Sequence, residues 1–274
     1  MYDQNEKAGN RGDVVKHPAL MAALGAVLDG SSEEREFLFA DLFAGFSHYS
    51  LTPSSGEWEE GIGKLGQIDP RPTFDQAFLQ HWFEWYVRRR PSLRYGTYPG
   101  SSVVALDVAQ SLERTLRVAA WDTAPSAVAD LMNTLGQGQH SVRARPADPD
   151  DHDVQDADFL FIDPPRQNDW GKVKRFLRKN SGNVLVWLPL HVKDKTATIG
   201  APAGKARDWA LQHGYSVTRV RWDHHSTHTL VLVGCQLIYS FNGNQDAVRA
   251  LQAAVTEVGN PSLWAPRWTI EHKP

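Results

Sequence analysis

An acid at the end of an apolar run is the first candidate for chemistry in this sequence. Asp163 follows the run Phe159–Ile162 and precedes two prolines, Pro164 and Pro165. The prolines fix φ and leave nearby carbonyl groups free of helix or strand pairing. If the run is a strand of a parallel sheet, this turn lies at the edge where open α/β sheets bind ligands. The Asp163 carboxylate and the Pro164 carbonyl could then hold an exocyclic amino group, as in enzymes that methylate nucleic-acid bases. The alternative is a turn that only ends a strand.

Apolar periodicity predicts the elements that would position these groups. Strands alternate with helices of about 10 to 15 residues, which is typical of a parallel sheet covered by helices. The last two strands follow each other without a helix, which predicts an antiparallel strand at the sheet edge. We therefore expect an α/β fold with a doubly wound, mostly parallel, seven-stranded sheet, the Rossmann-like layout of class I methyltransferases. The expected strands are 36–42, 117–121, 141–144, 158–162, 183–188, 215–222 and 229–240, and the expected helices are 13–28, 102–114, 125–135, 170–179, 205–214 and 245–257.

One stretch interrupts this alternation. Residues from about 50 to 97 contain a polar turn region followed by an aromatic helix, 74–89. We interpret the stretch as a helical insertion subdomain within a single domain that covers residues 1–274.

Composition narrows the class of protein. The net charge is −3, so nucleic acid would have to be bound through a local basic patch. The single cysteine, Cys235, excludes an intrachain disulfide and a cysteine-built zinc site, and it suits a reducing cytoplasm. No apolar run approaches the roughly 20 residues that span a bilayer, and the N-terminus lacks an apolar signal core. We expect a soluble, cytoplasmic protein that is a monomer and holds no metal.

Two further acids end predicted strands. Asp122 follows the strand 117–121, and an acid at the tip of the second strand is the expected ligand of ribose hydroxyl groups in a doubly wound fold. Its alternative role is to cap the helix that begins at Pro125. Asp41 ends the first strand and is a candidate for contacting the amino-acid end of a cofactor.

Several motifs along the chain resemble those of a known family. They are Lys7–His17, Asp41–Gly45 with Tyr49, Gly56–Ile62, Leu93–Tyr95 with Tyr98–Ser101, Ile162–Pro165 and Trp187–Pro189. Each motif is short, but their common order from residue 7 to about residue 190 is specific. The sequence resembles the bacterial 23S ribosomal RNA adenine-N6 methyltransferase family of the RlmJ type.

The resemblance implies S-adenosylmethionine as the cofactor and ribosomal RNA as the partner. It also implies that Asp163 holds the target amino group next to the cofactor. The catalytic positions would be Asp163, Pro164 and Arg166, and the cofactor-binding positions would be His17, Asp41, Phe43, Gly45, Ser101, Asp122 and Asp163.

The sequence departs from the family pattern in four places. One is the acid expected beside the cofactor's adenine after the strand near Val142, for which Asp148 fits only with a shifted register. The other three lie in two turns. In the turn after the first strand, Phe43 takes the place of a histidine, and Phe46 and Ser47 replace a segment with a second glycine. A serine is tolerated there if its φ is negative, although close approach of the backbone to the cofactor becomes harder. Arg166 stands where adenine-N6 enzymes carry an aromatic residue that stacks on the base. A guanidinium group can also stack on a base, so activity on adenine depends on where Arg166 lies.

Two basic clusters could contact RNA phosphates. Arg88–Arg90 and Arg94 lie beside aromatic residues of the insertion, which could instead fill its own small core. The helix 170–179 carries five Lys and Arg residues, which could equally form an ordinary solvated face. The tract His224–His228 looks like a metal site, but it lacks an acid at helical spacing and is better interpreted as a polar hairpin loop.

The sequence leaves three functions open. The first is N6-methylation of an adenine in 23S ribosomal RNA, in a protein-free or loop form from which a base is readily unstacked. The second is methylation of another base, a protein or a small molecule, for which Arg166 would recruit an anionic or carbonyl group. The third is a degenerate relative that binds RNA or another partner without catalysis. Cofactor binding separates the third function from the others, and the position of Arg166 separates the first two.

Overall fold

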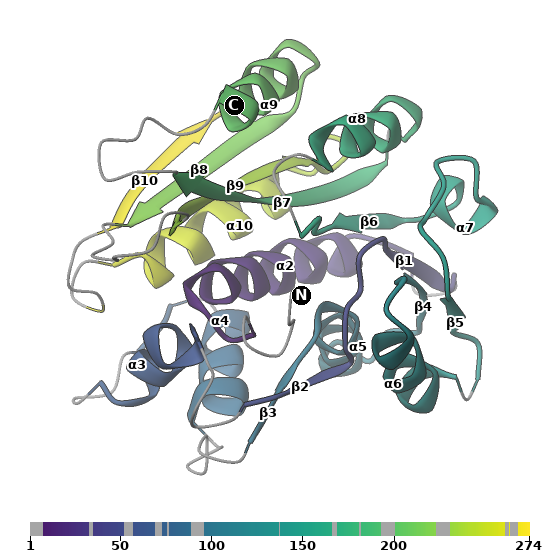
Figure 1. Ribbon diagram of the computed structural model, residues 1–274, viewed down its shortest axis with the longest axis horizontal. Helices are drawn as coiled ribbons and strands as arrows, with labels where there is room; N and C mark the ends of the chain where they lie inside the picture. The colour runs from purple at the N-terminus through teal and green to yellow at the C-terminus, as the bar shows by residue number, and fades with distance from the viewer. Residues whose placement is uncertain are drawn as a thin grey trace.

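A mixed sheet of eight strands forms the centre of the molecule (Figure 1). The structure is a computed structural model that describes residues 8–32, 35–51, 57–68, 73–75, 77–88, 96–136, 138–165, 169–180, 182–192, 201–222, 231–260, 263 and 268–274. The strands of the sheet are β1 (Phe37–Asp41), β4 (Leu116–Trp121), β5 (Ser141–Arg143), β6 (Phe159–Ile162), β7 (Asn183–Val192), β8 (Ser216–Trp222), β9 (Val231–Ser240) and β10 (Trp268–Lys273).

The strand order is β10-β8-β9-β7-β6-β1-β4-β5. The neighbours from β7 to β5 pair in parallel, whereas β9 is antiparallel to both β7 and β8, and β10 is antiparallel to β8. The predicted doubly wound, mostly parallel fold is therefore confirmed. The predicted antiparallel edge strand is present, but it is β10 and lies outside the final predicted pair, and the predicted number of seven strands was wrong because the sheet has eight.

Apolar runs form the central strands because both faces of the sheet are covered. Every residue of β1 and β6 is buried. Their side chains alternate between two core clusters: Phe39, Phe159 and Phe161 belong to one, and Leu160 and Ile162 belong to the other. A charged side chain is consequently accommodated only where a strand ends.

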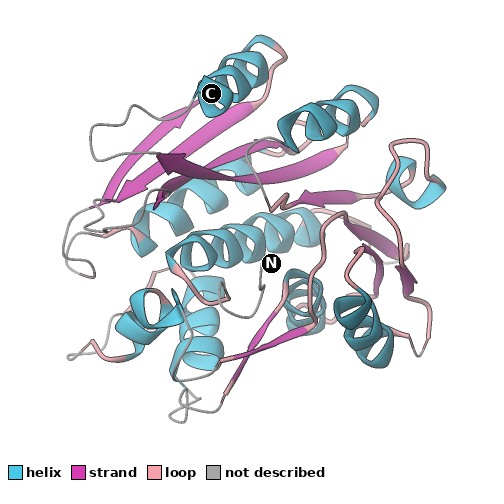
Figure 2. Cartoon of the chain, in the orientation of Figure 1, coloured by secondary structure: helices cyan, strands magenta, loops and turns pink. Residues whose placement is uncertain are grey.

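Helices cover the two faces of the sheet in separate layers (Figure 2). The helices α2 (Arg11–Asp29), α5 (Ser101–Ser111), α6 (Pro125–Leu135) and α10 (Gln245–Val258) contribute side chains to the first cluster. The helices α7 (His152–Gln155), α8 (Trp170–Lys179) and α9 (Ala201–Gln212) contribute to the second. The bounds predicted for α6 and α8 are confirmed, whereas α7 was not predicted.

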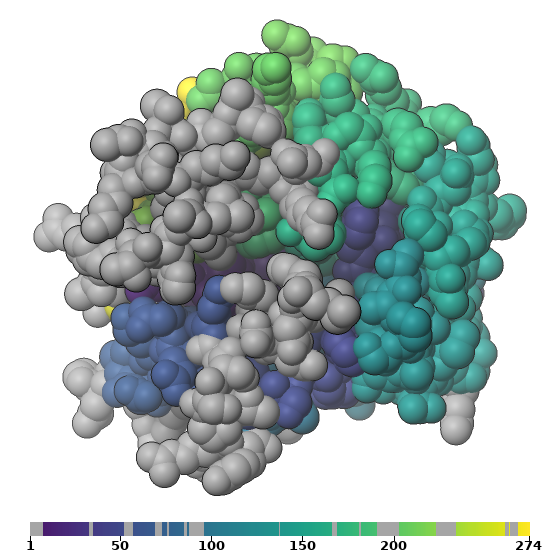
Figure 3. Space-filling model, viewed as in Figure 1, coloured from purple at the N-terminus to yellow at the C-terminus, as the bar shows by residue number. Residues whose placement is uncertain are grey.

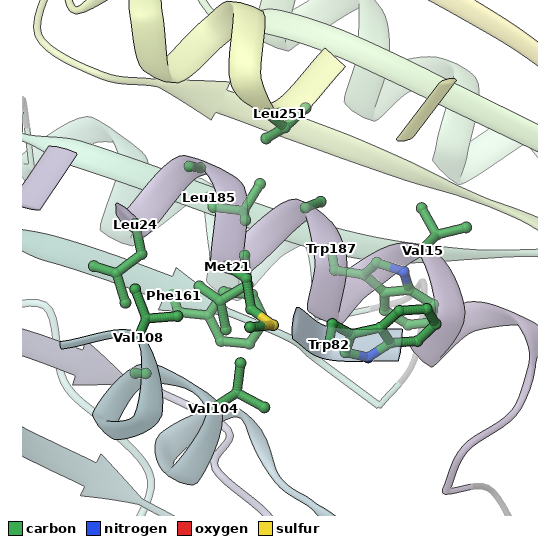
Figure 4. Packing of buried hydrophobic residues seen from close by; sticks show 14 of the residues in the cluster. Val15, Met21, Leu24, Trp82, Val104, Val108, Phe161, Leu185, Trp187 and Leu251 are labelled. Atoms are coloured by element: carbon green, nitrogen blue, oxygen red, sulfur yellow. The ribbon is translucent and has the colours of Figure 1, made fainter. Parts of the chain in front are cut away.

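The helix α2 is buried along almost its whole length. Its Met21 lies among Val104 of α5 and Phe161 of β6, and its Val15 lies beside Trp82 and Trp187 (Figure 4). On its other side α2 packs against α10. This central position brings the first turns of α2 to the C-terminal edge of the central strands.

The region predicted as an insertion begins and ends in a small antiparallel pair, β2 (His48–Ser50) and β3 (Thr97–Pro99). Between these strands lie the 3-10 helix η1 (Glu57–Glu60), α3 (Ile62–Gly66), α4 (Ala77–Trp82) and the π-helix η2 (Phe83–Arg88). The aromatic side chains of Trp82 and Phe83 are buried, but they belong to the main core and not to a separate core of the insertion. The side chains of Arg88–Arg90 and Arg94 lie outside the described residues.

No helix in the described part of the chain is long and apolar enough to cross a membrane. The described residues also contain no group of three or more His, Cys, Asp or Glu side chains that could hold a metal ion. The tract His224–His228 lies outside the described residues.

Candidate cofactor and substrate site

Three acids meet at the C-terminal edge of the central strands. The chain runs from β1 to β4 and β5 and then returns to β6 on the other side of β1, so the topological switch point lies between β1 and β6. Ligands of open α/β sheets bind at this point. Asp41 ends β1, Asp122 follows β4, and Asp163 follows β6. In the space-filling view of Figure 3, the purple N-terminal part of the chain is recessed here between green and teal segments.

Asp41 is fully buried and only half satisfied. Its Oδ2 atom accepts hydrogen bonds from the Ser101 hydroxyl at 2.6 Å and from the Ser102 hydroxyl at 2.9 Å. Its Oδ1 atom is buried and has no hydrogen-bond partner within the described structure. Burial raises the pKa of Asp41 to about 6, although the two hydroxyl groups oppose the shift. The unpartnered oxygen is an acceptor that a ligand cation or N–H group can use.

Asp122 holds the loop between β1 and β2, residues 42–47. Its Oδ2 atom accepts from the Gly45 amide at 3.0 Å, and its Oδ1 atom accepts from the Ala124 amide at 2.7 Å. It does not cap α6, whose N-cap residue is Ala124. Gly45 has a φ of 65°, a conformation that glycine adopts without strain. The predicted cofactor positions Gly45 and Asp122 are thus in direct contact.

Asp163 is held by a lysine that comes from the other end of the chain. Lys16 of α2 donates to Asp163 Oδ2 at 2.7 Å and lies 2.6 Å from Asp13 Oδ1. The Lys16 side chain is 13% exposed and the Asp163 side chain 17%, so the ion pair is shielded from solvent. The Lys16 ammonium group also lies 5.5 Å from the ring centre of Trp187. The described residues form no hydrogen bond with Asp163 Oδ1, which leaves this oxygen available.

Burial and the mutual charges of Asp13, Lys16 and Asp163 shift the pKa values of these three groups. Burial acts to lower the pKa of Lys16, but Asp13 and then Asp163 outweigh it and hold the pKa well above its ordinary value. Burial acts to raise the pKa of Asp13, but Lys16 outweighs it and the pKa lies below its ordinary value. Burial raises the pKa of Asp163, and Lys16 limits this rise. Lys16 is therefore a buried cation that favours the ionised form of both neighbouring carboxyl groups.

His17, the residue after Lys16 in α2, is buried. Its side chain is 1% exposed, and its Nδ1 atom is 2.9 Å from the Tyr98 hydroxyl. That hydroxyl also accepts from Trp82 Nε1 at 3.3 Å. Burial lowers the pKa of His17 to about 3, so the ring is neutral. The contact is a hydrogen bond when Tyr98 donates to Nδ1 and His17 carries its proton on Nε2. This geometry makes His17 a packing and hydrogen-bonding partner of Tyr98.

The remaining predicted positions are distributed around the same edge. Ser101 begins α5 and contacts Asp41, and Phe43 packs partly buried against the second core cluster. Pro164 is buried directly after Asp163, and no described backbone amide donates to its carbonyl group. Arg166 lies outside the described residues, so its position relative to the pocket stays a prediction. On α8 the basic side chains face outward, and Lys172 pairs with Asp169.

Sequence reasoning missed the residues that tie these groups together. Lys16, Asp13 and Tyr98 lie within the quoted motifs but received no role, and Asp130 of α6 was not considered. A signal for the first pair was present, because Asp13 and Lys16 are three residues apart and therefore share one face of a helix. The contact between Lys16 and Asp163 spans 147 positions in sequence and follows only from the fold.

Comparison with known proteins identifies proteins that are similar to this chain in sequence and in fold. No family model matches the chain. Ribosomal RNA large subunit methyltransferase J of Haemophilus influenzae is 25% identical over 225 residues, which cover 72% of this chain and 73% of the relative. The crystal structure of protein LPL1258 from Legionella pneumophila superposes with a TM-score of 0.69 and covers 97% of each chain at 19% identity, which shows a common fold. Together with the motifs and the strand order, this relative shows that the chain is similar to RlmJ-type ribosomal RNA methyltransferases.

Proposed function

We propose that this chain transfers a methyl group from S-adenosylmethionine to the N6 amino group of an adenine in 23S ribosomal RNA. The observation that carries the proposal is Asp163, a lysine-paired carboxylate with one available oxygen, placed directly before Pro164 at the switch point of the sheet. The Haemophilus relative, named as a ribosomal RNA large subunit methyltransferase, supports RNA as the substrate class.

The residues at the ends of β1 and β4 fit the cofactor. The unpartnered Oδ1 atom of Asp41 suits the ammonium group of the methionine part, because a cation there would satisfy a buried acceptor. Asp122 remains partly exposed beside Gly45, where its oxygens can also accept ribose hydroxyl groups. Ser101 and Ser102 fix the plane of the Asp41 carboxylate. When bound, the cofactor supplies a methyl group on a positively charged sulfur atom.

Asp163 and Pro164 would orient the amino group of the substrate. The N6 lone pair of adenine is delocalised into the ring, which makes the nitrogen a poor nucleophile. Accepting its two N–H groups, one at Asp163 Oδ1 and one at the Pro164 carbonyl, localises the lone pair and aims it away from the acceptors. Lys16 favours the ionised form of Asp163 and fixes its second oxygen. The contribution of these groups is positioning and preorganised electrostatics.

Two variants test this function. In the parent protein, S-adenosylhomocysteine should bind in calorimetry, and labelled methyl groups should be transferred to ribosomal RNA that lacks its own modification. Asp163→Ala should bind S-adenosylhomocysteine but transfer no methyl groups, because the acceptor of the amino group is gone. Asp150→Asn is the matched control, since Asp150 is also paired with a lysine but is 66% exposed, and it should keep full activity. Full activity of Asp163→Ala would refute the mechanism, and absence of binding by the parent would favour a non-catalytic relative.

Finer properties of the proposal stay predictions. They are a monomeric state, a cytoplasmic location, and a protein-free or loop form of the RNA in which unstacking a base costs least.

A further inference from the structure

The β1–β2 loop, residues 42–47, contains one residue in the left-handed region. That residue is Gly45, and no other described residue of the loop has a positive φ. Phe46 and Ser47 therefore continue the chain in conformations that any residue can adopt. The loop does not need a second glycine at this point, but it does need something that holds Ser47 in place.

Asp130 of α6 supplies that restraint through a single oxygen atom. Its Oδ2 atom accepts from the Ser47 amide at 2.6 Å, from the Ser47 hydroxyl at 2.6 Å and from the His48 amide at 3.4 Å. The Ser47 hydroxyl also lies 2.8 Å from the Thr134 hydroxyl, one turn further along α6. Ser47 is fully buried. Its amide therefore depends on the carboxylate, because a buried donor without an acceptor is costly, whereas its hydroxyl also has the Thr134 hydroxyl and His48 Nδ1 within reach.

Ser47 links Asp130 to the residues that bind Asp41. Its carbonyl oxygen accepts from the Gly100 amide at 2.7 Å. Gly100 is in such close contact with the loop that a Cβ atom there would lie 2.0 Å from the Phe46 carbonyl oxygen. The next two residues, Ser101 and Ser102, bind Asp41. A continuous chain of contacts thus runs from α6 through the loop to the carboxylate at the end of β1.

A second acid holds the loop near the start of α6. Asp122, just before α6, binds the Gly45 amide, and Asp130, within α6, binds Ser47. The two acids thus bind the residues before and after Phe46 and restrain the backbone between them. This is the backbone that faces a ligand at the edge of the sheet.

We propose that Asp130 is a positioning residue for the cofactor, which sets the β1–β2 loop and, through Gly100, the carboxylate plane of Asp41. The inference rests on the proposed function, because it assigns Asp130 to the binding of S-adenosylmethionine. Asp130 itself touches neither cofactor nor substrate. Its effect is to keep the loop in the bound conformation before the ligand arrives, which reduces the ordering cost of binding.

The test compares three variants with the parent. In Asp130→Ala, the affinity for S-adenosylhomocysteine and the KM for S-adenosylmethionine should each worsen by about tenfold, the effect expected when one buried charge-assisted contact no longer orders the site. The kcat and the KM for RNA should change by less than about twofold, since ligand that does bind still restores the loop. Asp130→Asn keeps an oxygen acceptor and should recover most of the affinity. Asn133→Ala, at an exposed position of the same helix, is the control and should behave as the parent.

The outcomes separate this inference from the proposed function. A merely structural role would lower the active fraction and therefore kcat, with an unchanged KM for S-adenosylmethionine, and that result would overturn the inference. Parent-like affinity of Asp130→Ala would overturn it as well, while the parent's own binding would still uphold the proposed function. If the parent itself binds no S-adenosylhomocysteine, the proposed function is refuted, and the inference that rests on it is refuted as well.

Discussion

Replacing Asp41 by Asn should stabilise the ligand-free protein at neutral pH and at the same time weaken cofactor binding. Burial raises the pKa of Asp41 from an ordinary 3.8 to about 6. A carboxyl group with a higher pKa in the folded state holds its proton more tightly there, so its ionisation favours unfolding. The stability that this group provides is fully present below about pH 4 and is lost as the pH rises through about 6.

The size of the effect follows from the shift. A rise of about two pKa units corresponds to about 3 kcal/mol of stability lost at pH 8, at about 1.4 kcal/mol per unit. Asn has the same shape and an oxygen that can accept from Ser101 and Ser102, but it does not ionise. The free energy of unfolding of Asp41→Asn should therefore match that of the parent near pH 4 and exceed it by about 3 kcal/mol at pH 8.

Urea unfolding between pH 4.5 and pH 8 measures this difference, and calorimetry with S-adenosylhomocysteine measures the loss of affinity. Other titrating groups are common to both proteins and cancel in the comparison. Asp150→Asn serves as the control for the same substitution at an exposed carboxyl group. If the stability difference between Asp41→Asn and the parent were constant across this range, the argument from burial would be refuted.

Two further substitutions test the roles of Lys16 and His17. Lys16→Met removes the cation between Asp13 and Asp163, so the pKa of Asp163 should rise and the pH–rate profile of methyl transfer should shift to higher pH. The same substitution should lower the free energy of unfolding by about 3 kcal/mol. An unshifted profile would contradict the role given to Lys16. Burial lowers the pKa of His17 to about 3, so only the unfolded state takes up this proton as the pH falls below about 6.5, and stability is lost in that range. His17→Gln should lose less stability than the parent between pH 6.5 and pH 5 in urea unfolding, and equal losses would show that His17 titrates normally in the folded protein.

The sequence predicted the fold where burial imposes a strong pattern. The strands around Phe39 and Phe161 are continuous apolar runs, and the helices α6 and α8 have clear starts at Pro125 and Trp170. The strand β10 escaped prediction because Trp268–Lys273 mixes aromatic and charged residues and only one of its edges is paired. The order of β8 and β9 could not be read from their adjacency in sequence, since a hairpin can be added to a sheet through either strand.

The site was predictable to the extent that its residues end strands. Asp41, Asp122 and Asp163 were found in this way, and the structure brings them to one edge. Lys16, which pairs with Asp163, and Asp130, which binds Ser47, were not found, because they lie within helices whose sequences look ordinary. A lysine inside a buried helix is informative only when the opposing carboxylate is known, and that knowledge requires the tertiary structure.

The burial of α2 has a consequence for how the chain folds during synthesis. This helix leaves the ribosome more than 200 residues before α10, against which one side of it packs. Domains dominated by contacts between distant segments fold slowly and expose apolar surface in the meantime. We therefore expect nascent chains that stop before residue 245 to leave α2 open to proteases and chaperones, and pulse proteolysis of stalled chains would reveal this. The cluster of Asp13, Lys16 and Asp163 would then form late in synthesis.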